Sequence, residues 1–201
     1  MRPTRFAEWF EAFANVVPFQ QLSLDAGLAI VGRLVERFGR HLEHGGRRFH
    51  AFPTSCAIAE AHPDALRECG LSARKAESLR DLARAIESGE LTEEKISDMS
   101  TDDALRMLTE LPGIGPWSAG LVLLRGLGRL DVFPPGDVGA ERRLGTLMRL
   151  RSGASLERVV ERFGGSRGYL YFCGLGGSLL ATGLIHAAPP SRVLGAPPSA
   201  P

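Results

Sequence analysis

The sequence has few cysteines and no long apolar run. Cys56, Cys69 and Cys173 are widely spaced and form no C-x-x-C pair, so we expect no zinc site, iron–sulfur cluster or disulfide framework. No apolar stretch reaches about 18 residues, which argues against a transmembrane helix and a membrane partner. Glu8 and Glu11 interrupt the region where a secretory signal would need apolar residues. We therefore expect free thiols and a cytoplasmic location.

The sequence also lacks a net charge of either sign. Its 24 Lys+Arg residues balance 23 Asp+Glu residues, which leaves a formal charge of +1. Taken alone, this balance argues against a strongly basic nucleic-acid-binding protein. The basic residues are almost all arginine, however, with lysine only at Lys75 and Lys95. Arginine supplies planar forks that bind phosphate through two hydrogen bonds.

Alternating patterns of strand length are absent too, and apolar residues recur at three- and four-residue spacing instead. This pattern predicts an all-α fold with about ten short helices and no internal repeat. The expected helical ranges are 6–17, 23–38, 54–62, 63–70, 72–88, 92–99, 101–110, 117–127, 138–149, 156–163 and 167–180. Residues 41–52, which contain Gly45-Gly46, are expected to form a polar loop. The tail at 189–201 is rich in Pro, Ala and Ser and is predicted to be disordered.

The most informative segment is residues 111–119, Leu-Pro-Gly-Ile-Gly-Pro-Trp-Ser-Ala, between two amphipathic helices. Its two glycines allow a tight turn and a close approach to another surface. The second helix would begin at Pro116, where free N–H groups and the positive end of the dipole bind a phosphate. This predicts a helix-hairpin-helix motif that contacts DNA backbone, although an ordinary interhelical turn is the alternative. The expected DNA-contacting residues are Gly113, Ile114, Gly115, Trp117 and Ser118.

A second informative segment is the loop at 131–139, which is rich in proline and glycine and contains Asp137, twenty positions after Trp117. The loop presents a carboxylate at the predicted start of a helix. Aspartate is also a common helix N-cap, so a purely structural role for Asp137 stays open at this point. The combination of the two segments is more specific than either segment alone.

Together these segments resemble the helix-hairpin-helix, Gly/Pro-loop, Asp signature of the HhH-GPD DNA glycosylase superfamily. Within it, the sequence is most similar to the 3-methyladenine DNA glycosylase II branch, the AlkA-like enzymes. The resemblance covers roughly residues 5–185. It implies a two-lobed helical core over residues 1–188. Residues 24–130 would form the helix-hairpin-helix lobe, and residues 1–23 plus 131–188 would form the second lobe.

The resemblance implies a base excision repair enzyme that flips a damaged nucleotide and hydrolyses its N-glycosidic bond. Asp137 would stabilise the oxocarbenium-like sugar and orient the attacking water. Asp131 and Glu141 are competing acids nearby, but Asp137 alone matches the signature. Trp117 stands where bifunctional relatives have a Schiff-base lysine, so a monofunctional enzyme without lyase activity is implied. Its indole would stack on an alkylated purine of the 3-methyladenine or 7-methylguanine type.

Further site residues follow from the same resemblance. Gln21 and Leu22 match the loop that inserts into the gap left by the flipped base, although a simple helix lead-in capped by Ser23 is the alternative. Leu121 and Ser166 match pocket positions where relatives carry aromatic residues, which implies a wider or less aromatic pocket. A monovalent cation, Na⁺ or K⁺, is expected on the carbonyls of Thr109, Leu111 and Ile114. No other cofactor is implied.

The resemblance implies that the partner is double-stranded DNA with a damaged base. It also implies a monomeric protein that is associated with the bacterial nucleoid. The charge distribution agrees, because acids concentrate between positions 87 and 103 whereas arginines cluster around the hairpin and the Asp137 loop. These arginines are Arg125, Arg129, Arg142, Arg143, Arg149 and Arg151. A balanced total can conceal a basic face of this kind.

Three alternatives remain open on the sequence. The first is a non-catalytic helix-hairpin-helix protein that binds damaged DNA. The second is a glycosylase of another branch that acts on deaminated, etheno or mismatched bases. The third is a helical interaction protein with no DNA role, for which the hairpin and the Asp137 loop would be a coincidence.

Overall fold

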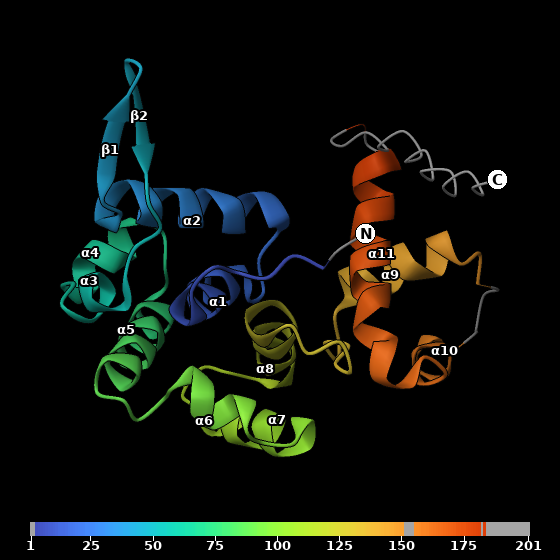
Figure 1. Cartoon of the computed structure of the whole chain (residues 1–201). Helices are drawn as coiled ribbons and strands as arrows, with labels where there is room; N and C mark the ends of the chain where they lie inside the picture. Colours follow the sequence, from blue (N-terminus) through green and yellow to red (C-terminus); the bar gives the residue numbers. More distant parts are fainter. Residues whose placement is uncertain (1–2, 151–154, 182, 184–201) are drawn as a thin grey trace, which may run out of the picture.

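The computed structural model describes residues 3–150, 155–181 and 183 of the chain. The disorder prediction for residues 189–201 lies outside the described residues. In Figure 1, the helices form a large group that includes α1 to α8 and a smaller group that includes α9 to α11. None of the helices in the described part is long and apolar enough to cross a membrane.

The chain enters the larger group through α1 (Trp9–Val16), the 3₁₀ turn η1 (Val17–Phe19) and α2 (Leu24–Phe38). The side chain of Ser23 accepts a hydrogen bond from the Ala26 N–H, which confirms the predicted N-cap of α2. Gly27 lets the ring of Phe19 lie directly against α2, since a Cβ at position 27 would overlap that ring. The connection between η1 and α2 is therefore short and closely packed.

Residues 41–50 form an antiparallel hairpin of β1 (His41–His44) and β2 (Arg47–His50), which projects from the end of α2 in Figure 1. The prediction of a polar loop in this region is wrong. Gly45 and Gly46 both have positive φ and supply the two-residue turn. The periodicity of apolar residues did not predict the hairpin, because almost all of its residues are exposed and neither face needs an apolar pattern.

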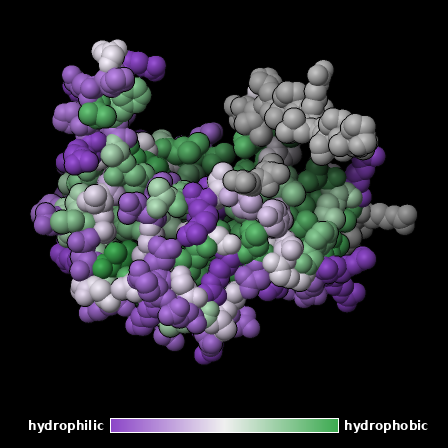
Figure 2. Space-filling view, viewed as in Figure 1, coloured by the Kyte–Doolittle hydropathy of each residue, from purple (hydrophilic) through white to green (hydrophobic). Residues whose placement is uncertain are grey.

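Helices with hydroxyl or histidine N-caps build much of the rest of the larger group. They are α3 (Ser55–Ala59), α4 (Pro63–Glu68), α5 (Ala73–Glu87), α6 (Glu93–Ser97) and α7 (Thr101–Glu110). After a turn, α8 (Pro116–Leu121) continues as the π-helical segment η2 (Val122–Leu127). Most of the main hydrophobic core lies among these elements, with Phe13, Leu79 and Leu123 fully buried, and it continues to Ala140 and to Tyr171 and Phe172 of the smaller group. Hydrophilic residues predominate along the lower edge of the molecule in Figure 2, where α6 and α7 lie.

The smaller group contains α9 (Val138–Leu147), α10 (Leu156–Glu161), the 3₁₀ turn η3 (Gly164–Ser166) and α11 (Arg167–Ala181). Leu144, Val160 and Leu170 form its own small core. The predicted helical fold class is thus confirmed, with the small sheet as an addition. The lobe boundaries stay a prediction, but α1 packs against α5, α8 and η2 of the larger group.

Two glycines of α2 provide a matched test of this packing. Gly27→Ala is expected to lower the free energy of unfolding by about 1–3 kcal/mol, because the methyl group must displace the Phe19 ring. Gly32→Ala lies in the same helix with open space around it and is expected to raise that free energy by about 0.5–1 kcal/mol. Urea denaturation of both variants measures the difference. Equal effects of the two substitutions would contradict the close Phe19 contact.

Candidate functional site

A groove of about 880 Å³ brings together segments that are far apart in the sequence. One wall is the connection between η1 and α2, a second is the start of α5 with the turn between α7 and α8, and a third is the loop before α9. Most of the predicted site residues line this single groove. They are Gln21, Leu22, Thr109, Leu111, Gly113, Ile114, Gly115, Trp117, Ser118 and Asp137.

A hydrogen bond joins the two most informative residues of the sequence. The indole Nε1–H of Trp117 donates to Oδ2 of Asp137 at 3.0 Å. The other carboxylate oxygen, Oδ1, accepts the N–H of Ala140 at 2.7 Å, so Asp137 is the N-cap of α9. The two readings of Asp137, as a cap and as a site residue, are therefore compatible. Capping fixes the orientation of the carboxylate, and the indole holds it in the groove.

Gly120 allows these two residues to meet, and it was not singled out from the sequence. A Cβ at this position would lie 3.0 Å from Cα of Pro134 and 3.2 Å from Cδ of Pro135. The proline loop therefore rests directly on α8, and the chain reaches Asp137 two residues later. The available signal was a glycine inside a helical pattern, which often marks a close packing contact.

The turn between α7 and α8 also depends on a glycine. Gly113 has φ +81°, and a Cβ there would overlap the hydroxyl of Ser78. Ser78 is buried and donates to the carbonyl oxygen of Pro112 at 2.6 Å. This contact fixes the turn on α5, so that Gly115 and Pro116 begin α8 at the edge of the groove.

Lys75 and Gln20 tie the opposite wall of the groove together. The Lys75 ammonium donates to the carbonyl oxygens of Pro18 at 3.1 Å and Gln20 at 2.6 Å. The Gln20 side-chain amide donates to the carbonyl oxygen of Gly113 at 2.7 Å and to the Ser118 hydroxyl at 3.0 Å. Ser118, a predicted DNA contact, is itself buried and serves this internal link. Sequence reasoning assigned no role to Lys75, because these contacts are tertiary.

Two predicted pocket residues do not line the groove. Leu121 is buried in the main core, and Ser166 is exposed at the end of η3. A different aromatic residue lies near the carboxylate. Burial raises the pKa of Tyr171, and the negative charge of Asp137 raises it further. Tyr171 packs edge-on against Phe133, so the surroundings of Asp137 contain an aromatic residue, one of three (Trp9, Tyr169 and Tyr171) that the sequence offers as compensation for Leu121 and Ser166.

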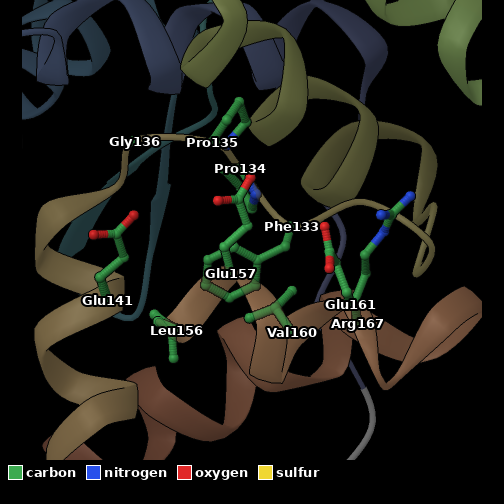
Figure 3. A pocket seen from close by; sticks show the side chains of 10 residues that line it. All are labelled: Phe133, Pro134, Pro135, Gly136, Glu141, Leu156, Glu157, Val160, Glu161 and Arg167. Carbon is green, nitrogen blue, oxygen red and sulfur yellow. The ribbon is translucent and has the colours of Figure 1, made fainter. Parts of the chain in front are cut away.

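The competing acids are engaged elsewhere. The carboxylate of Asp131 accepts the hydroxyl of Thr101 at 2.5 Å, and its carbonyl oxygen accepts a hydrogen bond from Arg167. Glu141 faces a second cavity of about 330 Å³ on the other side of the proline loop (Figure 3). This cavity is lined by Glu141, Glu157 and Glu161, with Arg167 as its one basic residue among those labelled in the figure. Its negative charge disfavours a phosphate backbone, whereas Arg74 and Lys75 line the larger groove.

The expected basic face needs a correction, because two of its arginines are internal. The guanidinium of Arg125 lies over the rings of Phe6 and Phe172, and burial lowers its pKa. Arg129 donates to the carbonyl oxygens of Ile96, Ser97 and Met99. Arg142 and Arg149 are exposed and Arg143 is half-buried, while Arg151 lies outside the described residues. Proximity in sequence did not reveal which way these side chains point.

Thr109, Leu111 and Ile114, the expected cation-binding residues, lie together along the groove. The carbonyl oxygen of Leu111 accepts the Ile114 N–H at 3.0 Å, and a carbonyl oxygen has a second lone pair for a cation. The donor set therefore fits a monovalent cation, which stays a prediction. Within the described ranges, no group of three His, Cys, Asp or Glu residues could hold a metal ion.

The architecture and the Trp117–Asp137 pair agree with a comparison against known families. Residues 15–165 match the HhH-GPD superfamily, described as base excision DNA repair proteins. The chain belongs to the HhH-GPD superfamily. This membership confirms the family expected from the hairpin and the Gly/Pro loop.

Individual relatives agree with this HhH-GPD membership. The chain is 32% identical to the DNA-3-methyladenine glycosylase of Bacillus subtilis (strain 168) over 161 residues, 80% of this chain and 53% of that protein. The structure of 3-methyladenine DNA-glycosylase from Archaeoglobus fulgidus has a TM-score of 0.73 at 33% identity, over 88% of this chain and 61% of that chain. The Schizosaccharomyces pombe 3-methyladenine DNA glycosylase bound to abasic DNA has a TM-score of 0.64 at 28% identity, over 85% of this chain and 82% of that chain. The HhH-GPD chain described here spans about half the length of the curated relatives it matches.

The capping role of Asp137 leads to a stability prediction. Asp137→Ala removes the acceptor for the Ala140 N–H and is expected to lower the free energy of unfolding by about 1 kcal/mol. Asp137→Asn keeps one oxygen to cap α9, and asparagine caps helices as well as aspartate does, so it should lose less stability than Asp137→Ala although its NH2 group cannot accept the Trp117 N–H. Thermal denaturation distinguishes the two variants. If alanine were tolerated as well as asparagine, the cap would contribute nothing.

Proposed function

We propose that this protein is a monofunctional DNA glycosylase that releases alkylated purines of the 3-methyladenine or 7-methylguanine type from double-stranded DNA. The observation that carries the proposal is the Trp117–Asp137 hydrogen bond in the groove of an HhH-GPD fold. The names of the matched relatives support the choice of alkylated purines. Binding of DNA alone would need neither a fixed carboxylate nor an indole beside it.

Asp137 is the residue that supports bond cleavage. As the base leaves, the sugar gains positive charge, and a carboxylate held beside it stabilises that charge without reorganising. Both oxygens of Asp137 accept N–H hydrogen bonds, which reduces their power as nucleophiles and favours electrostatic stabilisation. Water is then the nucleophile, oriented by the same carboxylate, and the products are a free base and an abasic strand.

Trp117 positions the base and limits the chemistry. Its N–H edge points to Asp137 and its half-buried ring lines the groove, where we propose that the indole stacks on an electron-poor or cationic purine. An indole forms no Schiff base, so strand cleavage by the route of bifunctional relatives is closed at this position. The one lysine among the residues that line the groove is Lys75, whose ammonium donates to two backbone carbonyls.

The remaining groove residues bind the duplex. The start of α8 offers the backbone N–H groups of Gly115, Trp117 and Ser118 to a phosphate, while Pro116 has none, and a monovalent cation on the nearby carbonyls would bridge protein and DNA. Leu22 is 45% exposed although it is a large apolar residue, as expected for a wedge between bases. The protein would act on DNA as a monomer.

The central prediction concerns Asp137→Asn, with methylated duplex DNA as substrate and free bases measured by chromatography. The wild type is expected to release methylpurines, and Asp137→Asn should release them at least about a hundredfold more slowly, because a preorganised charge is lost. Glu141→Gln is the matched control, since this acid lies on the other side of the loop. Near-normal release by Asp137→Asn would contradict the assignment of Asp137 as the catalytic carboxylate. Duplex binding without any release by the wild type would favour the non-catalytic alternative.

A second prediction concerns the fate of the strand. Product DNA should remain intact until it is treated with alkali, and borohydride should trap no covalent protein–DNA adduct, because Trp117 replaces the Schiff-base lysine. Denaturing electrophoresis with and without alkali measures both. A trapped adduct in the wild type would contradict monofunctional chemistry. Loss of that adduct in Lys75→Met would identify the amine responsible.

Release of deaminated or etheno bases in preference to methylpurines would assign the protein to another branch.

A further inference from the structure

We propose that Lys75 is a positioning residue that holds the segment Gln20–Leu22 in the conformation that presents Leu22 to DNA. The proposal deepens the proposed function and rests on it. It starts from the direction of the Lys75 side chain, which turns toward the protein backbone and binds two carbonyl oxygens of one short segment. A lysine that served only as a phosphate contact would keep its ammonium in solvent on a flexible stem.

The two acceptors of Lys75 define the curvature of the segment. The carbonyl oxygens of Pro18 and Gln20 are two residues apart and converge on one ammonium, at 3.1 Å and 2.6 Å. Converging carbonyl dipoles repel each other unless a cation lies between them. Hydrogen bonds from a charged donor are stronger than neutral ones, so this contact stabilises the bend.

The bend leads into a strained residue at the tip. Gln21 has φ +56°, in the left-handed region, and it is not a glycine. Such a conformation costs about 1–2 kcal/mol and persists only where the surroundings hold it. On the far side of Gln21, the Leu22 N–H donates to the Phe19 carbonyl at 3.2 Å, and Ser23 caps α2. Lys75 supplies the restraint on the near side.

Gln20 extends the effect of Lys75 to the hairpin turn. The backbone carbonyl of Gln20 binds Lys75, while its side-chain amide binds the Gly113 carbonyl and the Ser118 hydroxyl. The segment that carries the wedge and the turn that begins α8 are therefore joined through one residue. Lys75 would place the wedge at a set distance from the phosphate-binding turn, which is what simultaneous binding of both to one duplex requires.

The neighbouring Arg74 provides a matched comparison. It is exposed and lines the same groove, so it has the free guanidinium that a phosphate contact needs. Lys75→Met keeps the apolar stem but removes the ammonium, and Arg74→Met removes the exposed charge. The two substitutions delete the same formal charge from adjacent positions. A purely electrostatic role predicts the same result for both, whereas a positioning role predicts different results.

The experiment uses a duplex with a tetrahydrofuran abasic analogue next to 2-aminopurine, whose fluorescence rises when the wedge unstacks it. Lys75→Met is expected to lose most of that rise. With methylated duplex DNA as a separate substrate, it is expected to release methylpurine about tenfold more slowly in single turnover. Its affinity for undamaged duplex should keep the wild-type salt dependence. Arg74→Met should retain the fluorescence rise, and its log-log salt slope should be shallower by about 1.

The outcomes separate the roles. A shallower salt slope with normal unstacking in Lys75→Met would make Lys75 a phosphate contact and overturn the proposal. If Lys75→Met does not fold, Lys75→Gln replaces it, because its shorter and uncharged side chain keeps a polar group at this position without the ammonium that lies between the two carbonyls, and the same loss of unstacking is expected. If the wild type releases no methylpurine, the proposed function fails, while the fluorescence of the abasic duplex still tests Lys75.

Discussion

The contact between the Trp117 indole and the Asp137 carboxylate joins the hairpin turn to the start of α9, and several other features depend on it. Gly120 lets the Pro134–Pro135 segment, which leads to Asp137, pack closely on α8. The carboxylate keeps its direction because its other oxygen caps α9. Packing, helix capping and the candidate chemistry therefore meet in one side chain, and the chain offers little freedom to change any of them separately.

The helices and much of the site could be predicted from the sequence because their signals are local. Capping residues such as Ser23 and Thr54 mark helix starts, and the hairpin and the Gly/Pro loop are continuous segments. Features that depend on tertiary contacts could not be read in this way. Nothing in the sequence indicates that Lys75 reaches Pro18, or that Arg125 lies between two phenylalanine rings. The β-hairpin was missed because exposed strands need no alternation of apolar residues.

Fewer basic side chains are available to bind DNA than the positions of the arginines in the sequence indicated. Arg125 packs over the Phe6 ring and Arg129 donates to backbone carbonyls, so neither faces the groove. The acidic cavity lies on the other side of the Asp137 loop. Arg74 and Lys75 are the cations that line the groove. A duplex in this groove would therefore make few ionic contacts, so most discrimination between bases must come from the geometry around Trp117 rather than from attraction to phosphate.

The exposed β-hairpin has a consequence for association between molecules. In a two-stranded sheet, both strands are edge strands, and each presents unpaired N–H and C=O groups to solvent. Such edges invite strand addition by another chain, a risk that exposed Leu42 and Phe49 increase. Arg47 lies over the ring of Phe49, and the neighbouring ion pair of Glu43 and Arg48 places charge on the opposite face of the hairpin. Charged side chains of this kind disfavour strand addition at exposed edges.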